Sequence, residues 1–332
     1  MTLVVTGSIA FDYLMSFPGK FTEHLLPEHM HRLSLSFLVD TMDKRRGGCA
    51  PNIAYTLALL GERPLLMATA GQDFGDYRTW LEAVGIDTSH VKVIDGKFTA
   101  SFFCSTDQAN NQIASFYTGA MANAGELSFR LIAGLKNDGL VIVSPNDPEG
   151  MVQYAQECSA LGIRYIWDPG QQCARMDGPQ LVEGVTGAFM VILNDYELEL
   201  LRQKTGIGEA ELLEEVELLV ITKGEKGSAV MSRNHGRVDV PSVAPDRIED
   251  PTGVGDAFRG GFMKGLAIGA SYEVCARIGS VAATYALEHL GGSSHAYNQE
   301  EFIARYEKHF GAMTEGFRTP VSSPRSAVHG PR

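Results

Sequence analysis

The sequence predicts an α/β fold in which helices flank a doubly wound, mostly parallel sheet. Short runs of consecutive apolar residues alternate along the chain with segments of helical periodicity. Such runs are typical of strands buried on both faces, as in parallel sheets covered by helices. They lie at residues 3–7, 140–143, 165–167, 189–193 and 218–221. With 332 residues, 44% of them hydrophobic, the chain can bury a large core, and we expect one α/β domain over residues 1–311.

A second, smaller sheet is predicted from segments of a different kind. Residues 32–39 alternate apolar and polar side chains, which indicates a strand with one buried face. Residues 99–105 and 112–117 have the composition of two further strands, joined by a turn-rich segment. We expect a discontinuous β lid from roughly residues 12–17, 32–43 and 99–118. Residues 312–332 are rich in Pro, Ser and Arg, which predicts a loose C-terminal tail.

Composition narrows the classes of partner and the compartment. The chain has 28 basic and 40 acidic residues, and its formal net charge of −12 argues against nucleic-acid partners and anionic membranes. Five cysteines are scattered without a C-x-x-C pair, which suits free thiols in a reducing compartment. The nine histidines show no metal-binding spacing. Because no apolar run approaches membrane-spanning length and no basic secretory signal opens the sequence, we expect a cytoplasmic protein.

Residues 250–261 carry the strongest functional signal. Gly253, Gly255 and Asp256 come directly before apolar residues at helical spacing, so a glycine-rich turn opens a helix. The free N–H groups and the helix dipole at such a turn form an anion site. A carboxylate there repels phosphate unless it takes the proton of a hydroxyl that attacks the phosphate. The pattern predicts phosphoryl transfer with Asp256 as general base, although Gly-x-Gly followed by an acid also occurs in ordinary turns.

A second glycine motif, far upstream, strengthens this interpretation. Gly47 and Gly48 precede a helix that has Pro51 near its first position and ends at Gly61. The two motifs together resemble the PfkB family of carbohydrate and nucleoside kinases, which has the ribokinase-like fold.

The match to that family covers both motifs residue by residue. Its Gly-Gly followed by Asn corresponds to Gly47, Gly48 and Asn52. Its Asp-Thr-x-Gly-Ala-Gly-Asp corresponds to residues 250–256, with Pro251 in place of the usual Thr and Val254 in place of Ala. Neither change removes a backbone N–H from the anion loop proper, so we expect activity to be retained. The resemblance covers nearly the whole chain and implies a large α/β domain with a β lid.

The resemblance also implies residues for the acceptor side. Asp256 would take the hydroxyl proton while the backbone N–H groups of Gly253, Val254 and Gly255 stabilise the migrating phosphoryl group. The candidates for binding the hydroxyl groups of the acceptor are Asp12, Gly47, Gly48 and Asn52. For Asp12 a turn-capping role stays open, and for Asn52 a bond to its own helix start.

On the nucleotide side, the resemblance implies ATP and Mg²⁺. Asn194 and Glu197 match the family's Asn-x-x-Glu, in which Glu197 would hold the water shell of Mg²⁺, although the pair equally suits a capping box. Arg259 can reach a phosphate or face solvent. The remaining ATP-binding candidates follow the predicted strand at 218–221: Thr222, Lys223, Gly224 and Gly227. Further expectations are K⁺ activation through carbonyls near Asp250, Gly291 and Ser294, and a homodimer formed through the lid sheet.

The acceptor is predicted from the lid. Residues 112–121 resemble those of a bacterial and archaeal subgroup assigned as adenosine or nucleoside kinases. Gln112, Phe103 and Phe116 are the lid candidates for substrate binding, and the two rings with Met121 would form a purine wall unless they only pack the strands. We expect transfer to the 5′-hydroxyl of adenosine, with a ribokinase- or fructokinase-type sugar kinase second. A non-catalytic sensor conflicts with the intact Asp256, and a redox Rossmann enzyme lacks its Gly-x-Gly-x-x-Gly.

Overall fold

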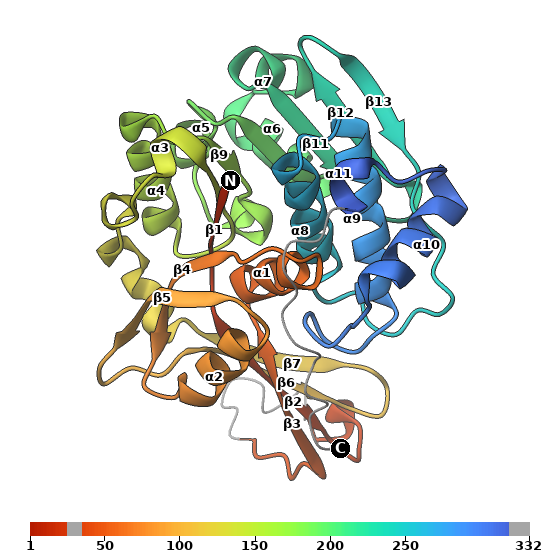
Figure 1. The fold of residues 1–332 in the computed structure, drawn as a ribbon. Coiled ribbons are helices and arrows are strands. Elements are labelled where there is room, and N and C mark those ends of the chain that lie inside the picture. Colours follow the sequence, from red (N-terminus) through yellow and green to blue (C-terminus); the bar gives the residue numbers. More distant parts are fainter. Residues whose placement is uncertain (25–34, 319–332) are drawn as a thin grey trace.

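The predicted apolar runs lie in one large sheet in the computed structural model, which describes residues 1–24 and 35–318 (Figure 1). Its nine strands within that part of the chain run in the order β13-β12-β11-β10-β9-β8-β1-β4-β5. All neighbours from β11 to β5 are parallel, whereas β12 and β13 are antiparallel. Their bounds are β1 (Thr2–Thr6), β4 (Leu65–Gly71), β5 (Asp87–Ile94), β8 (Gly139–Val143), β9 (Tyr165–Trp167), β10 (Met190–Asn194), β11 (Leu218–Thr222), β12 (Ser228–Ser232) and β13 (Gly236–Val240). The doubly wound, mostly parallel sheet is thereby confirmed.

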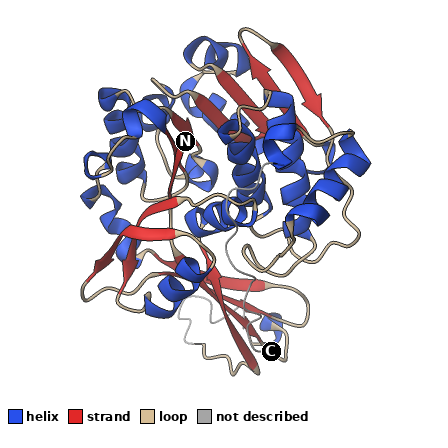
Figure 2. Cartoon of the chain, in the orientation of Figure 1, coloured by secondary structure: helices blue, strands red, loops and turns tan. Residues whose placement is uncertain are grey.

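Helices cover both faces of this sheet (Figure 2). Side chains alternate between faces along a strand, so Leu3 and Val5 of β1 join one core while Val4 joins the other. The first core is covered by α1 (Cys49–Leu59), α2 (Gly75–Ala83), α8 (Val254–Ala267) and α9 (Tyr272–Leu287). The second is covered by α4 (Pro148–Leu161), α5 (Gly178–Val185), α6 (Asp195–Thr205) and α7 (Glu209–Glu215). Shorter or peripheral helices are α3 (Leu135–Asp138), α10 (Gln299–Phe310) and α11 (Glu315–Arg318). In the part of the chain described, no helix combines the length and apolar character needed to cross a bilayer.

The small sheet lies at one end of the body and has the order β3-β2-β6-β7 (Figure 1). Its strands are β2 (Ala10–Ser16), β3 (Thr41–Gly47), β6 (Ala100–Thr106) and β7 (Gln112–Tyr117). The predicted strand at 32–39 was wrong: residues 32–34 lie outside the described part, and residues 35–39 belong to no strand. Phe37 packs instead against Phe17 and Phe21, at ring separations of 5.0 and 4.8 Å. The outer strand β3 is mostly charged, as suits an exposed edge, and so lacks the apolar alternation that marks a half-buried strand.

The end of the described chain packs onto the body. Met313 and Phe317 are buried, and the Phe317 ring stacks on Phe302 at 5.5 Å between centroids. The predicted loose tail was therefore wrong for residues 312–318, because two apolar side chains in a polar segment suffice to dock it. Residues 319–332 lie outside the described part.

Candidate active site

A cavity of about 240 Å³ lies where the carboxyl ends of β9, β10 and β11 meet the start of α8. Ligands of doubly wound folds bind at this edge of the sheet. Three helix N-termini contribute, since Cys49 begins α1, Asn194 caps α6 and Gly253 caps α8. The lining residues are Cys49, Pro145, Asp168, Gly170, Gln171, Asn194, Glu197, Thr222, Gly253, Gly255, Asp256 and Arg259.

The predicted anion loop opens α8 as expected. Gly253 has φ of 77°, and a Cβ there would lie 2.4 Å from Cα of Gly292, so both backbone shape and close approach require glycine. The Val254 N–H donates to the carbonyl of Pro251 at 3.3 Å. Among the described residues, no hydrogen bond uses the N–H groups of Gly253, Gly255 or Asp256. The loop therefore presents free donors at the positive end of the α8 dipole.

Asn52 and Asp256 come together from the two glycine motifs. Asn52 Nδ2 donates to Asp256 Oδ2 at 2.9 Å across 204 residues of sequence. Asn52 is buried, and its Oδ1 has no hydrogen-bond partner within the described chain. A buried acceptor without a donor is unfavourable, so Oδ1 can still accept one more hydrogen bond. The structure thus places Asn52 at the Asp256 carboxylate and leaves it one free acceptor.

The environment of Asp256 favours a proton-accepting role. Burial raises the pKa of this carboxyl above its ordinary value, and the charge of Glu197 adds to the rise. The charge of Arg259 and the hydrogen bonds from Asn52 and Cys49 oppose it. A carboxylate with a raised pKa is a stronger base than one in water, which suits a group that must take a hydroxyl proton.

Asn194 and Glu197 form the capping box that sequence left as an alternative. Asn194 Oδ1 accepts from the Glu197 N–H at 2.7 Å, and Glu197 Oε2 accepts from the Asn194 N–H at 2.8 Å. Both residues also line the cavity, and Glu197 is buried there. The cap fixes the orientation of Glu197, so one segment serves the helix and presents a carboxylate to the site.

The loop after β11 is only partly at the cavity. Thr222 lines it, whereas Lys223, Gly224 and Gly227 are not among its lining residues. Lys223 Nζ lies 3.8 Å from a carboxylate oxygen of Asp239, on the neighbouring antiparallel strand. Gly227 has φ of 85°, and a Cβ there would meet the Val240 carbonyl at 2.1 Å. Gly227 therefore has a structural reason to be glycine, whatever it binds.

Asp12 and the double glycine, the residues expected to bind the acceptor, lie together. A Cβ on Gly47 would lie 2.5 Å from Asp12 Oδ2, and one on Gly48 would lie 2.4 Å from the Ser8 carbonyl. The space above Gly47 is thus occupied by the Asp12 carboxylate. Burial raises the pKa of Asp12 to about 6; the charge of Arg45 opposes this and that of Asp250 adds to it. A carboxylate held here can accept two hydroxyl hydrogen bonds.

The lid aromatics do not form the wall that was expected. Phe102 pairs with Asp12 on one side and with Phe116 on the other, so these three side chains share one face of the small sheet. Phe103 is on the opposite face, where it stacks on Tyr13 at 4.8 Å. The expectation that Phe103 and Phe116 form one wall was wrong, because neighbours along a strand alternate faces. Phe102 is the ring that sequence reasoning missed.

Two further lid candidates lie at opposite ends of the small sheet. Gln112 pairs with Thr106, which pairs with Ser16 at the other end of β2. Its Nε2 donates to Thr106 Oγ1 at 3.5 Å. Met121 is buried in a small cluster with two alanines, Ala10 and Ala100. Gln112 is therefore at the far end of the sheet from Asp12, whereas Met121 packs beside the Ala10–Ala100 pair, two positions before the Asp12–Phe102 pair on the same face.

Asp250 ties the anion loop to a loop near the C-terminus. Its Oδ1 accepts from the Thr252 N–H and its Oδ2 from the Gly291 N–H, both at 2.9 Å. Ser294 Oγ donates to the Leu290 carbonyl at 2.5 Å and lies 3.5 Å from that of Gly291. The three residues for which K⁺ contacts were expected, Asp250, Gly291 and Ser294, are therefore held together, with carbonyl groups on both loops.

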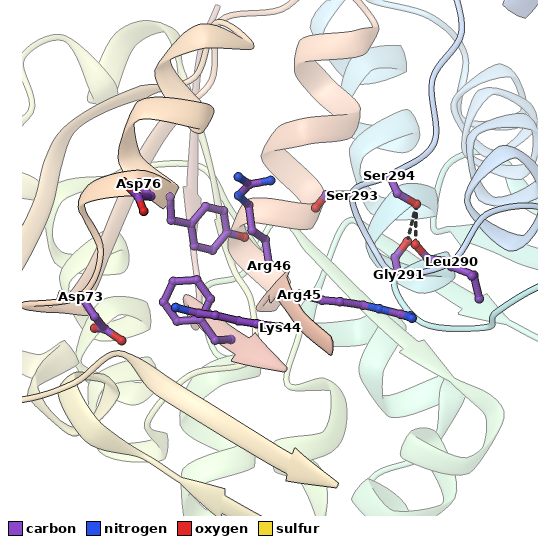
Figure 3. Close-up of a pocket in the computed structure, with 11 residues that line it drawn as sticks. Lys44, Arg45, Arg46, Asp73, Asp76, Leu290, Gly291, Ser293 and Ser294 are labelled. Atoms are coloured by element: carbon purple, nitrogen blue, oxygen red, sulfur yellow. Dashed lines mark hydrogen bonds between the residues drawn. The ribbon is translucent and has the colours of Figure 1, made fainter. Parts of the chain in front are cut away.

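A second cavity, of about 370 Å³, lies behind this loop, between β3, the start of α2 and residues 290–294 (Figure 3). Lys44 extends over the Phe11 ring at 3.8 Å, and Arg45 reaches toward Gly291 (Figure 3). Arg45 Nη1 lies 3.8 Å from Asp250 Oδ2. Asp12 and Asn52 line neither this cavity nor the smaller one, but the charge of Arg45, which lines this cavity, acts on Asp12.

Comparison with known proteins agrees with this arrangement. The profile of the pfkB family carbohydrate kinase matches residues 10–298. The chain belongs to the pfkB family of carbohydrate kinases. A nucleoside kinase of Methanocaldococcus jannaschii is 27% identical over 310 residues, covering 92% of this chain and 97% of the relative. A solved Burkholderia thailandensis nucleoside kinase in complex with inosine is 38% identical, with a TM-score of 0.82 and coverage of 94% of this chain and 99% of its own. The ribokinase-like fold and the kinase class are thereby confirmed.

The site of this PfkB kinase also contains residues that were not predicted, Asp168 and Gln171. It contains Arg259 as well, whose role the sequence left open. Asp168 follows β9 directly and is fully buried, and Arg259 on α8 forms an ion pair with it. Gln171 Nε2 donates to Cys49 Sγ at 3.7 Å within the cavity wall. One feature of the sequence could have indicated Asp168: it directly follows an apolar run, and ligands of such sheets bind at the carboxyl ends of the strands.

Proposed function

We propose that this PfkB kinase transfers the γ-phosphate of ATP to the hydroxymethyl group of a nucleoside. The observation that carries the proposal is the hydrogen bond between Asn52 and Asp256, which joins both glycine motifs beside the free N–H groups of α8. The curated nucleoside kinases of two archaea and the Burkholderia enzyme, solved with inosine and with ADP-inosine, support the same acceptor class. Asp256 is the proposed general base.

The transfer step follows from the residues present. The acceptor hydroxyl gives its proton to Asp256, and its oxygen forms a bond to the γ-phosphorus while the bond to the β-phosphate oxygen breaks and ADP leaves. The N–H groups of Gly253 and Gly255 stabilise the oxygens of the moving phosphoryl group. Val254 joins them once its weak contact with Pro251 is given up. Asp12 and Asn52 hold the acceptor so that its hydroxyl lies in line with the phosphate.

Mg²⁺ fits the residues on the nucleotide side. Glu197 is buried at the cavity, and one of its oxygens is taken by the capping box, so the other is available to a hydrated cation. Mg²⁺ keeps several waters and needs few protein ligands, which matches a single carboxylate at this position. When bound, it would neutralise charge on the phosphates. Asn194 and Thr222 line the same part of the cavity and would contact the nucleotide phosphates, with Lys223, Gly224 and Gly227 farther along the loop.

Adenosine remains the first proposed acceptor, with inosine as the comparator. Phe102 and Phe116 share the face of the lid that carries Asp12, so a base attached to a sugar at Asp12 would lie against these rings. Gly47 and Gly48 have no side chain because the Asp12 carboxylate and the Ser8 carbonyl occupy the space beside them, and this brings the backbone close to Asp12. Exposed aromatic groups suit a purine better than a free sugar, which offers only hydroxyl groups.

The test is ATP-dependent formation of ADP with adenosine, inosine, cytidine, ribose and fructose in parallel. The expected result is the highest kcat/KM for a purine nucleoside, with the phosphate on the 5′-oxygen by phosphorus NMR. Turnover of only ribose or fructose would show that the acceptor is a sugar and not a nucleoside. It would not contradict phosphoryl transfer with Asp256 as general base. If none of the five compounds is phosphorylated, the proposal is contradicted.

A K⁺ effect is proposed for the two loops joined by Asp250. The carbonyl groups near Asp250, Gly291 and Ser294 lie close to Gly253, so a cation there would steady the anion loop. Rates in K⁺ should exceed rates in a bulky organic cation at the same ionic strength. Equal rates would remove this role.

We also propose a homodimer in a reducing, cytoplasmic compartment. Strand β7 is an edge strand whose Ile113, Phe116 and Tyr117 are exposed, which favours pairing with a second copy. The cysteines are free and four of the five are buried, which is compatible with a reducing compartment. Light scattering at micromolar concentration that returns the monomer mass of 36.0 kDa would exclude the dimer.

A further inference from the structure

Arg259 and Asp168 form an ion pair in the wall of the catalytic cavity. Arg259 Nη2 donates to Asp168 Oδ1 at 2.6 Å, and Nε lies 2.5 Å from Asp168 Oδ2. Asp168 is 0% exposed and Arg259 is 8% exposed. Burial acts to lower the pKa of Arg259, but the charge of Asp168 reverses this and raises it, so the guanidinium stays charged. One hydrogen bond and a second close charge contact to the same carboxylate hold the guanidinium group against Asp168.

The other edge of the guanidinium faces the anion loop. Nε and Nη2 are engaged by Asp168, and within the described chain Nη1 makes no hydrogen bond. A Cβ added to Gly255 would lie 2.7 Å from Nη1, so the space beside Gly255 is taken by this nitrogen. Gly255 has no positive φ, and the absence of a side chain there is explained by the guanidinium. The free N–H donors of Arg259 are therefore beside the loop that would bind phosphate.

The charges that line the cavity make the position of Arg259 important. Asp168, Glu197 and Asp256 bring three carboxylates to the lining, and Arg259 is the one basic side chain among the described residues that line it. A nucleotide triphosphate adds further negative charge. A fixed cation inside the wall acts where water is excluded, so its effect on a phosphate is larger than that of a surface lysine.

We propose that Arg259 is a catalytic residue that donates from Nη1 to the phosphoryl group in transit, and that Asp168 is the positioning residue that holds it there. The inference rests on the proposed phosphoryl transfer and adds a charged donor to the backbone N–H groups of the anion loop. Arg259 also opposes the rise in the pKa of Asp256, which keeps the base ionised over a wider pH range.

An ion pair that only braced the fold would behave differently. Loss of one member of a buried pair destabilises a protein, and activity would then fall only with the amount of folded enzyme. The chain offers a matched control in Arg305 and Glu288, a largely buried pair with contacts of 2.8 and 2.5 Å between α10 and the residue that caps the end of α9. Arg305→Gln removes a comparable ion pair, and neither Arg305 nor Glu288 lines the cavity.

The experiment compares Arg259→Gln, Arg259→Lys, Asp168→Asn and Arg305→Gln with the wild-type enzyme, using ATP and the best acceptor. For Arg259→Gln we expect kcat to fall about 100-fold or more, within the range for loss of a transition-state donor, with little change in the KM of the acceptor. The kcat of Arg259→Lys should be higher than that of Arg259→Gln. The kcat of Asp168→Asn should lie between those of Arg259→Gln and the wild-type enzyme. The acidic limb of the kcat/KM profile should move to higher pH in Arg259→Gln. Arg305→Gln should retain kcat.

A double variant separates catalysis from folding. Asp168→Leu with Arg259→Met removes both buried charges, a change that proteins often tolerate or gain stability from. If the folded double variant returns to within threefold of the wild-type kcat, or if folded Arg259→Gln does, the proposal is overturned. A folded double variant that stays about 100-fold slow supports it. Wild-type turnover of the nucleosides, measured in the same series, tests the proposed function separately from the ratio between variant and wild type.

Discussion

The phosphate side of the site and its lid side are built differently. On the phosphate side, Asp168, Glu197 and Arg259 are buried charged groups held by hydrogen bonds to the main body. On the lid side, Phe116 is 47% exposed on an edge strand of a four-stranded sheet. Rigid, desolvated charges act on the transition state, whereas exposed rings act mainly on affinity. We therefore expect changes on the phosphate side to lower kcat and changes on the lid side to raise the KM of the acceptor.

Replacing Asp256 by Asn is the largest expected effect. The amide keeps the size of the side chain but cannot accept the hydroxyl proton, so kcat should fall by about 10²–10⁴-fold. ADP binding, measured by calorimetry, should change little, because the backbone N–H groups remain. Asp138→Asn, at a side chain that is 74% exposed on α3, is the control for the substitution itself. An Asp256→Asn enzyme that keeps more than about a tenth of the wild-type rate would contradict the general-base assignment.

Glu197→Gln tests the metal on the phosphate side. Glutamine can still accept the capping-box hydrogen bond from Asn194, so α6 should form, but the charge beside the cation is lost. The free Mg²⁺ needed for half-maximal rate should rise about tenfold. Glu301→Gln is the matched control, since Asn298 and Glu301 form the same capping box at the start of α10. An equal Mg²⁺ requirement in both variants would show that Glu197 serves the helix alone.

The lid prediction compares the two faces of one strand pair. Phe116→Ala removes a ring from the face that carries Asp12, and the KM of a purine nucleoside should rise about tenfold, as for loss of a stacking contact. Phe103→Ala removes a ring of the same size from the opposite face and should leave that KM within about twofold. The kcat of both variants should stay near the wild-type value. If Phe103→Ala raises the KM more than Phe116→Ala, the acceptor does not bind on the Asp12 face.

The difference between the two sides also explains what the sequence could predict. The helix start at Gly253, the double glycine and the Asn194–Glu197 cap are local patterns of backbone and charge, and each lies where it was expected. The main-body strands 140–143, 165–167 and 218–221 are continuous apolar runs and were equally visible. Long-range closeness, such as Asn52 with Asp256, came only from the family resemblance.

The errors concentrate in the small sheet for a physical reason. Strand β3 is an exposed edge with the sequence TMDKRRG, so no burial pattern marks it. The faces of Phe102, Phe103 and Phe116 depend on register, and a shift of one residue reverses them. The contact between Asp168 and Arg259 could not be predicted from local sequence, because the two residues are 91 positions apart. Neither glycine motif indicates which residue Arg259 contacts.

The smallest expected effect concerns the protonation of Asp12. Burial raises its pKa from 3.8 to about 6, so in the free enzyme the carboxyl is mostly neutral below that pH and charged above it. Hydroxyl groups of the acceptor donate to the charged form, and binding must therefore lower the pKa. Between about pH 5 and pH 6, nucleoside binding should release part of a proton, and affinity should weaken by at most tenfold for each unit of pH below 6.

Calorimetry of nucleoside binding in two buffers of different ionisation enthalpy measures that proton. The Asp256→Asn enzyme is the background, since burial also raises the pKa of Asp256. Burial raises the pKa of Asp168 to about 7 as well, so the comparison with and without Asp12 is what assigns the proton. Proton release near pH 5.5 that disappears on adding Asp12→Asn places the acceptor hydroxyls on Asp12. Release that persists without Asp12 assigns the proton to another group, and the acceptor would then bind away from the lid face that Asp12, Phe102 and Phe116 share. Because this readout needs no turnover, it locates the acceptor independently of the chemistry at Asp256.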